Sequence, residues 1–353
     1  MEYSLRCLSC GSVFPYSSKQ VCPKCGGILE VEYKDNAHAD FPSKPKSFWS
    51  FESLMPNGKY RHFELGMTKL IESTEPGLYL KLEFENPTRS FKDRGSAIEV
   101  AKAKEYGYDK IVCASTGNMA YSISYYAALY GLDAVVFISR GANKDKLFDI
   151  RQTHDAELHL INGDFTAAQA YAEEYAEKNR AFLAGDYCYR KEGQSTIGFE
   201  LAAQAQDLSN IIMPIGNGTL FSGVYKAYER MKEMRNSKVK IPRLIGVQAD
   251  GCAPVAKAFK EGVEVKYAKP ATAADAIAVG YPTYGMQVLR AVKDTNGTIV
   301  TVSDKAMRIE QERFYNEYGI KVELAAVASI AAYRKLARKL KGKTAALITG
   351  ANL

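Results

Sequence analysis

The chain has 353 residues, of which 46% are hydrophobic and 25% are charged, and its formal net charge is +7. This length can form more than one structural unit with a buried core, and the composition is typical of a globular protein. The mild positive charge suits a small anionic substrate, and no run of Lys and Arg is dense enough to predict nucleic-acid binding. No stretch is apolar enough to cross a membrane, and Met1–Leu5 lacks the features of a signal peptide, so we expect a cytoplasmic protein.

Four of the seven cysteines form two C-x-x-C pairs that are separated by eleven residues. They are Cys7, Cys10, Cys22 and Cys25. Glycines follow each pair where tight turns are needed, and four thiolates can surround one zinc ion tetrahedrally. Because disulfides are not expected in a reducing compartment, residues 1–33 are predicted to form a structural zinc ribbon. A ribbon that binds a partner or nucleic acid is the alternative.

The rest of the chain alternates between two periodicities. Residues 34–60 are polar and contain three prolines, which predicts a linker that packs on the main body. From residue 78 onward, β-rich runs alternate with segments of helical period, and this pattern predicts an α/β fold with parallel sheets. The expected strands are 79–83, 110–114, 134–138, 158–161, 211–214, 244–248, 298–302 and 345–349. The expected helices are 120–130, 165–178, 220–232, 304–318 and 325–340, with one more beginning near residue 97.

A lysine lies between a predicted strand and a predicted helix, in the ten residues Asn-Pro-Thr-Arg-Ser-Phe-Lys-Asp-Arg-Gly at positions 86–95. Partial burial and the nearby Arg94 cation would lower the proton affinity of Lys92 and activate its amine toward carbonyl groups. A solvated charged turn is the alternative interpretation. The stretch resembles the lysine loop of the threonine synthases, Asn-Pro-Thr-Gly-Ser-Phe-Lys-Asp-Arg-Gly, at nine of ten positions. Arg89 replaces the glycine of that loop.

Threonine synthases are pyridoxal 5′-phosphate (PLP) enzymes of the tryptophan-synthase-β superfamily, and the resemblance implies that Lys92 carries PLP as a Schiff base. It also implies a fold of two doubly wound α/β domains, preceded by the ribbon. The large PLP-binding domain would comprise residues 34–104 and 191–353, and the smaller inserted domain residues 105–190. PLP would lie in the cleft between the two domains. Dimers are common in the superfamily, which leaves a homodimer open.

Two further turns join a strand to a helix. Residues 115–118 read Ser-Thr-Gly-Asn and lie where a predicted helix begins. The free N–H groups at the start of a helix can bind a carboxylate or a phosphate. The alternative is that these residues only cap the helix. By resemblance, Ser115 and Thr116 bind the substrate and Asn118 bonds the phenolic oxygen of PLP. Residues 216–219 read Gly-Asn-Gly-Thr and resemble the loop for the PLP phosphate. The expected cradle is Gly216, Asn217, Gly218 and Thr219.

The resemblance assigns roles to two more residues, and Arg89 is the position at which the chain departs from it. Arg190 lies in the motif Arg-x-Glu-Gly-Gln-x-Thr and would bind the phosphate of the substrate. Arginine suits a phosphate because it can donate two parallel hydrogen bonds to it. A basic surface turn is the alternative interpretation. Thr349, at the end of the last expected strand, would face the pyridine nitrogen of PLP. Arg89 adds a positive charge near the reacting centre, and we expect it to strengthen a phosphate site or to select a different anionic substrate.

The resemblance predicts a threonine synthase, which converts O-phosphohomoserine and water into threonine and phosphate. Arg89 keeps an alternative open: a related PLP enzyme that performs β-replacement or β-elimination on another substituted amino acid, such as a cysteate-synthase-like enzyme. A zinc-ribbon adaptor whose α/β body has lost catalysis is a third hypothesis, and the presence of Lys92 and Asn118 counts against it.

Overall fold

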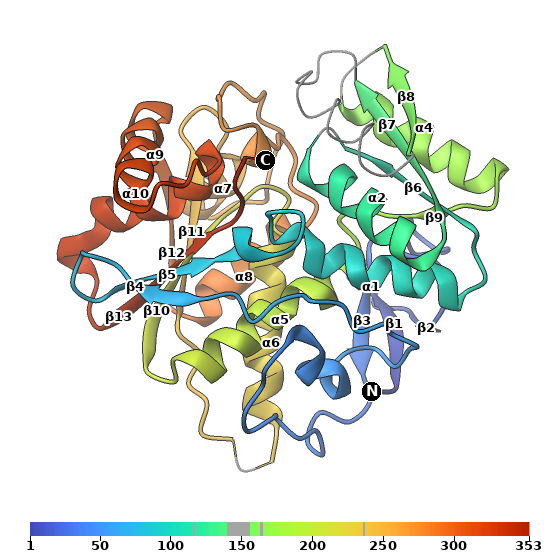
Figure 1. Cartoon of the computed structure of the whole chain (residues 1–353), viewed down its shortest axis with the longest axis horizontal. Coiled ribbons are helices and arrows are strands. Elements are labelled where there is room, and N and C mark those ends of the chain that lie inside the picture. The colour runs from blue at the N-terminus through green and yellow to red at the C-terminus, as the bar shows by residue number, and fades with distance from the viewer. Residues whose placement is uncertain (116, 140–155, 163–164, 236, 353) are drawn as a thin grey trace. The chain divides into compact units, whose positions relative to one another are not determined.

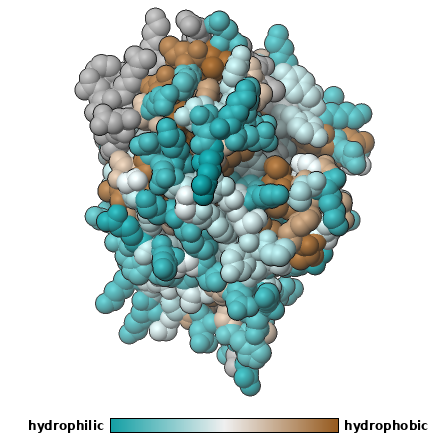
Figure 2. All heavy atoms as spheres, turned by 90° about the vertical axis from the view of Figure 1, so that its right-hand side faces the viewer, coloured by the Kyte–Doolittle hydropathy of each residue, from teal (hydrophilic) through white to brown (hydrophobic). Residues whose placement is uncertain are grey.

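The computed structural model describes residues 1–115, 117–139, 156–162, 165–235 and 237–352. These residues form two compact units. Unit 1 comprises Met1–Ala39, Glu52–Leu65 and Lys92–Gly193, and unit 2 comprises Asp40–Phe51, Gly66–Phe91 and Gln194–Leu353. No described helix is long and apolar enough to span a membrane. On the face in Figure 2, hydrophilic side chains surround small separate patches of hydrophobic ones.

Unit 1 contains two sheets. Residues of β1 (Tyr3–Cys7), β2 (Val13–Pro15) and β3 (Leu29–Tyr33) form a small antiparallel sheet in the order β2-β1-β3. The second sheet has the order β8-β7-β6-β9, and its described strands are all parallel. These strands are β6 (Lys110–Ala114), β7 (Asp133–Ser139), β8 (Glu157–Ile161) and β9 (Phe182–Leu183).

Helices lie against the parallel sheet of unit 1 because its central strands are apolar on both sides (Figure 1). Ala168 and Ala172 of α4 pack on Val112 and Val135 of the sheet. The helices of this unit are α1 (Lys92–Glu105), α2 (Asn118–Tyr130), α4 (Phe165–Lys178) and the beginning of α5 (Cys188–Gln204).

The described residues of unit 2 form a six-stranded sheet in the order β12-β11-β10-β13-β5-β4, which is parallel except for the antiparallel edge strand β4. Its strands are β4 (Leu70–Glu72), β5 (Leu78–Leu82), β10 (Leu208–Pro214), β11 (Arg243–Ala249), β12 (Thr298–Val302) and β13 (Lys343–Ile348). Its α-helices are α6 (Thr219–Glu233), α7 (Pro254–Glu261), α8 (Gly285–Asp294), α9 (Asp304–Tyr318) and α10 (Ala328–Leu336). Its 3-10 turns are η2 (Glu83–Glu85), η3 (Asp275–Ile277), η4 (Leu324–Val327) and η5 (Ala337–Lys339). The turn η1 (Phe48–Leu54) begins in unit 2 and ends in unit 1.

Helices cover both faces of this sheet, with α9 and α10 on one face and α6 and α8 on the other (Figure 1). The main core joins α9 and α10 to the apolar faces of β5, β11 and β13. Local sequence sets the ends of α9, because Ser303 accepts a hydrogen bond from the Ala306 N–H at its start and Gly319 adopts a left-handed φ of 70° at its end. The predicted α/β fold is confirmed, and the predicted domain boundaries stay predictions.

Several expectations differ from the structure. Helix α1 begins at Lys92 and not near residue 97, and two longer segments also differ. Residues 34–60 were expected to be a polar linker, but this segment contains η1, in which Phe48 and Phe51 are fully buried. The ring of Phe51 stacks on Phe199 of α5 at 5.6 Å between centroids, so the segment contributes to the core of unit 2. The single helix expected at 325–340 is divided into η4, α10 and η5.

Candidate active site

The loop that precedes Lys92 is fixed to the end of β13. Ser90 and Gly350 form a β-bridge, and the Phe91 N–H donates to the Thr349 carbonyl oxygen at 3.0 Å. The Ala351 N–H donates to the Arg89 carbonyl oxygen at 3.0 Å. Backbone hydrogen bonds from the last strand of the sheet therefore define the position of the chain immediately before the lysine.

Several predicted site residues of unit 2 lie at one edge of the sheet. Strands β10, β13 and β5 are parallel neighbours, so their carboxyl ends meet at the same edge. The Gly216 loop follows β10, Thr349 follows β13, and η2 and Arg89 follow β5. Ligands of open α/β sheets bind beyond this edge, which makes it the natural place for a cofactor.

The Gly216 loop has the features of a phosphate cradle. Gly218 has a φ of 84° and directly precedes α6, whose first turn contains no acidic residue. A Cβ atom on Gly218 would lie 2.8 Å from Cγ2 of Val288, and one on Gly216 would lie 2.9 Å from the Ala276 carbonyl oxygen. Both glycines are therefore required by the packing, and the N–H groups at the start of a long helix offer donors to an anion. The Asn217 side chain accepts from Thr283, and Thr219 is buried. These groups fit the phosphate of PLP.

In unit 1, Lys92 is the first residue of α1 and is half-buried. The next two residues, Asp93 and Arg94, are fully buried, and Oδ1 of Asp93 accepts a hydrogen bond from the Ser122 hydroxyl of α2 at 2.6 Å. The first turn of α1 is thus held by buried polar groups, and the solvated charged turn is the wrong interpretation of this stretch.

The second turn that was predicted to hold an anion lies in unit 1, between β6 and α2. Gly117 is the N-cap of α2, Asn118 is its first residue, and both are half-buried. The Ser115 hydroxyl accepts from the Gly117 N–H at 3.3 Å. Thr116 lies outside the described residues. The N-cap interpretation and the anion-binding interpretation are both compatible with this geometry, because an N-cap position is also where the helix dipole attracts an anion.

Arg190 is fully buried near the start of α5, which is a helix and not the surface turn of the alternative interpretation. Its Nε donates to the Gly185 carbonyl oxygen at 3.0 Å, and its Nη1 donates to the Lys92 carbonyl oxygen at 3.4 Å. Its Nη2 donates to the hydroxyl of Ser96 at 3.3 Å and forms an ion pair with Glu99. Every nitrogen of the guanidinium therefore has a protein acceptor. Its predicted role as a phosphate ligand stays a prediction.

Glu99 was not singled out from the sequence. Its side chain is fully buried, and its Oε1 accepts from the Gly185 N–H at 2.9 Å. Burial raises the pKa of the Glu99 carboxyl to about 7, and the Arg190 guanidinium opposes this rise. A charged residue inside the apolar stretch after Lys92 was the only sequence signal that could have revealed this pair.

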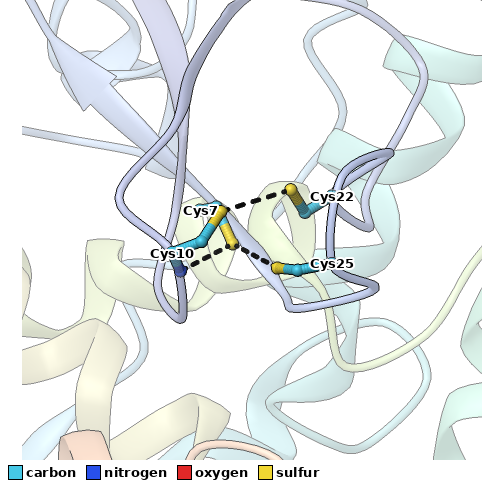
Figure 3. Close-up of side chains that lie close together, drawn as sticks. All are labelled: Cys7, Cys10, Cys22 and Cys25. Carbon is cyan, nitrogen blue, oxygen red and sulfur yellow. Dashed lines mark hydrogen bonds between the residues drawn. The ribbon is translucent and has the colours of Figure 1, made fainter.

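The four N-terminal cysteines come together (Figure 3), and their sulfur atoms all lie within 4.8 Å of one another. The Cys7 and Cys25 sulfurs are 3.5 Å apart, and those of Cys10 and Cys22 are 3.7 Å apart. A tetrahedral zinc ion with Zn–S bonds of about 2.3 Å has sulfur atoms about 3.8 Å apart, so the cluster fits this metal. Gly11 and Gly26, with φ values of 70° and 72°, supply the turns that the two pairs require.

Comparison with solved structures defines the class of fold. A maize serine racemase superposes with a TM-score of 0.71 at 22% identity, over 81% of this chain and 88% of that one. A threonine deaminase from Solanum lycopersicum superposes with a TM-score of 0.67 at 24% identity, over 78% and 75% of the two chains. At these identities the likeness establishes the fold.

The model of one family, described as "Pyridoxal-phosphate dependent enzyme", matches residues 63–350. The chain belongs to this family of enzymes, which confirms the predicted resemblance. The threonine synthase of Methanosarcina acetivorans is 33% identical over 95% of this chain and 87% of that protein. The threonine synthase of Methanocaldococcus jannaschii is 31% identical over 94% and 87% of the two chains.

Proposed function

We propose that this enzyme is a threonine synthase, which converts O-phosphohomoserine and water into threonine and inorganic phosphate. The observation that carries the proposal is the similarity of almost the whole chain to two threonine synthases. The lysine loop adds to it, because Lys92 opens a helix directly after a segment that is fixed to β13.

PLP, when bound, would supply the electron sink that lets a proton leave the carbon next to the substrate amine. Lys92 would hold the cofactor through its Nζ, release it to the substrate amine, and then remove and return protons as a general base and acid. Its position at the start of α1, next to buried Asp93 and Arg94, limits the orientations of the side chain.

The other predicted residues would bind and orient. Gly216, Asn217, Gly218 and Thr219 would hold the phosphate of PLP by N–H groups at the start of α6. Thr349 would lie at the pyridine nitrogen and Asn118 at the phenolic oxygen. Ser115 and the helix start behind it would receive the α-carboxylate of the substrate. We further propose that the four cysteines bind a structural zinc ion, since all four coordination positions would be occupied by protein thiolates.

A second candidate is favoured by one observation, the arginine at position 89 in place of the glycine of the threonine synthase loop. A related enzyme that eliminates or replaces a group at the β-carbon of O-phosphoserine, or of another amino acid with an anionic side chain, would also need an extra cation near Lys92.

The test is a phosphate-release assay on the purified holoenzyme, with O-phosphohomoserine and O-phosphoserine offered separately and amino-acid products identified by mass spectrometry. We expect phosphate and threonine from O-phosphohomoserine. The Lys92→Ala variant should produce roughly 1,000-fold less of both, because covalent and general-base catalysis would both be lost. Turnover of O-phosphoserine alone would instead favour the second candidate.

A further inference from the structure

Arg89 occupies a backbone conformation that does not suit an arginine. Its φ is 58°, in the left-handed region where a Cβ atom is disfavoured and glycine is the usual residue. The Arg89 N–H donates to the Asn86 carbonyl oxygen at 2.8 Å, and its carbonyl oxygen accepts from the Ala351 N–H at 3.0 Å. These bonds fix the conformation for any residue at this position, so glycine would be favoured unless the arginine side chain had a use.

Among the described residues, the Arg89 side chain has no partner. Arg89 is half-buried, and its Nε is fully buried without a hydrogen-bond partner among the described residues. No described carboxylate pairs with its guanidinium. A buried donor of a charged group that lacks an acceptor is costly, and an arginine in such a place is typically paired with an anion.

The guanidinium of Arg190, unlike that of Arg89, already has acceptors within the protein. Arg190 is the residue that the threonine synthase motif would offer to a phosphate, but its guanidinium donates to Gly185, Lys92 and Ser96 and pairs with Glu99. Releasing it would leave the fully buried Glu99 carboxylate without its cation, which is strongly unfavourable. The Arg89 guanidinium, by comparison, has no carboxylate partner to release in the described part of the chain.

Arg89 also lies where a substrate group must be recognised. It follows β5 at the same sheet edge as the Gly216 loop and Thr349. Lys92 is three positions further along the chain, so chain geometry alone limits the distance between the two Cα atoms to about 11 Å. An anionic group on the side chain of a substrate held at Lys92 can therefore come within reach of its guanidinium.

We propose that Arg89, and not Arg190, determines specificity by binding the tetrahedral oxyanion on the substrate side chain, a phosphate or a group of the same shape and charge. The guanidinium would donate two parallel N–H bonds to two oxygens of that group. This inference rests on one part of the proposed function, namely that the substrate is an amino acid with an anionic side chain. It therefore applies to both candidate reactions.

The experiment uses holoenzyme and three substitutions at one position. Arg89→Gly removes the cation and suits the φ of 58°, Arg89→Asn is neutral and tolerates the same backbone, and Arg89→Lys keeps the charge but loses the paired donors. Arg290→Gln is the matched control, because it removes one cation from the exposed face of α8. Binding of inorganic phosphate is measured by calorimetry, and KM and kcat are measured with each phosphorylated amino acid.

We expect Arg89→Gly and Arg89→Asn to weaken phosphate binding and to raise KM by about 10- to 100-fold, the equivalent of one charged hydrogen-bonded contact. The change in kcat should be smaller, Arg89→Lys should be intermediate, and Arg290→Gln should match the wild type. The visible spectrum of PLP and the melting temperature serve as checks on folding, and Arg89→Gly should melt no lower than the wild type.

Unchanged phosphate binding and KM in Arg89→Gly would overturn the inference, as would a wild-type protein that binds no phosphate at millimolar concentration. A larger rise of KM in Arg190→Gln than in Arg89→Gly, with cofactor still bound, would return the role to Arg190. Failure of the proposed function looks different: the wild type would release no phosphate from O-phosphohomoserine, whereas the loss of phosphate binding in Arg89→Gly would still be observed.

Discussion

Glu99 and Arg190 form an ion pair in which both side chains are fully buried, and Arg190 also contacts the carbonyl group of Lys92. The pair thus orients the first turn of α1 without any need to touch a substrate. Glu99 therefore acts by positioning Arg190 and α1. The pH dependence of the free energy of unfolding can test whether its carboxyl group is protonated in the folded protein.

Glu99 has an ordinary pKa of 4.5, which burial raises to about 7 in the folded protein. The folded state therefore binds a proton more tightly than the unfolded state, and the contribution of this group to stability is complete below pH 4.5 and is lost as the pH rises to about 7. We expect the difference in free energy of unfolding between the wild type and Glu99→Gln to fall across this window. Urea unfolding at a series of pH values measures it. A difference that grows with pH would mean that Arg190 holds the pKa of Glu99 below its ordinary value.

The sequence singles out candidate reactive residues but not the residues that support them. Lys92 and the Gly216 loop belong to contiguous motifs with fixed spacing, so they were recognisable in the sequence alone. Gly185 lies five residues before Arg190, but the partners of Arg190 in α1 are more than ninety residues away in the sequence, and no local pattern predicts that pairing. The only sequence signal for the left-handed φ of Arg89 was the glycine that the threonine synthase motif has at this position, because glycine favours such a backbone.

Strand β5 and helix α5 are joined by a buried polar network. Lys81 of β5 is fully buried and donates to Glu200 of α5 at 2.7 Å, to the Thr68 carbonyl oxygen at 2.7 Å and to Gln204 at 2.9 Å. Glu200 also accepts from the Met67 N–H at 2.6 Å. This network holds the segment before β4 against the strand that leads to the lysine loop.

We expect Lys81→Met to lower the free energy of unfolding by about 3–5 kcal/mol, because the buried Glu200 carboxylate would lose its cation. Replacing both residues, as in Lys81→Met with Glu200→Leu, should recover part of this loss. The exposed pair of Lys343 and Asp207 provides the control, and Lys343→Met should cost much less than Lys81→Met, because solvent screens an exposed ion pair. Equal losses for the buried and the exposed pair, measured by urea unfolding, would contradict the expectation.

Elements with a clear periodicity were predicted closely from the sequence. The bounds of β6, β12, α4 and α9 agree with the expected ranges, because β-branched runs and amphipathic stripes mark them directly. Helix α5 was missed. Its residues from Tyr189 to Leu201 are all buried, so it has no polar face, and its Arg-Lys-Glu sequence suggested a surface turn.

At the scale of the whole molecule, the sequence predicted the cysteine cluster and the α/β body, whereas the predicted domain boundaries stay predictions. The chain changes unit after residues 39, 51, 65, 91 and 193. The ribbon residues belong to the same unit as the sheet formed by β6 to β9, although more than fifty residues separate them in the sequence. Grouping of this kind depends on long-range packing, which periodicity and motif spacing do not encode.

We expect one zinc ion per chain when the metal content is measured by mass spectrometry. Cys22→Ser should lose the ion and melt at a lower temperature, because the small sheet of β1, β2 and β3 has little core of its own without the metal. Cys252→Ser is the control, since Cys252 is a buried residue outside the cluster and should keep the zinc. A metal-free chain with an unchanged melting temperature would argue against a structural role.

The pairing of β5 with β13 has a consequence for synthesis on the ribosome. β5 is translated early, whereas β13 follows every other strand of its sheet, and Thr349 and Ala351 follow β13. Until translation has passed these residues, the sheet consists of two separate parts, and Arg89 and Phe91 lack the backbone partners that fix them. A nascent chain that is interrupted before β13 therefore lacks the backbone bonds that fix the loop before Lys92, and these bonds form only after β13 and Ala351 have been translated.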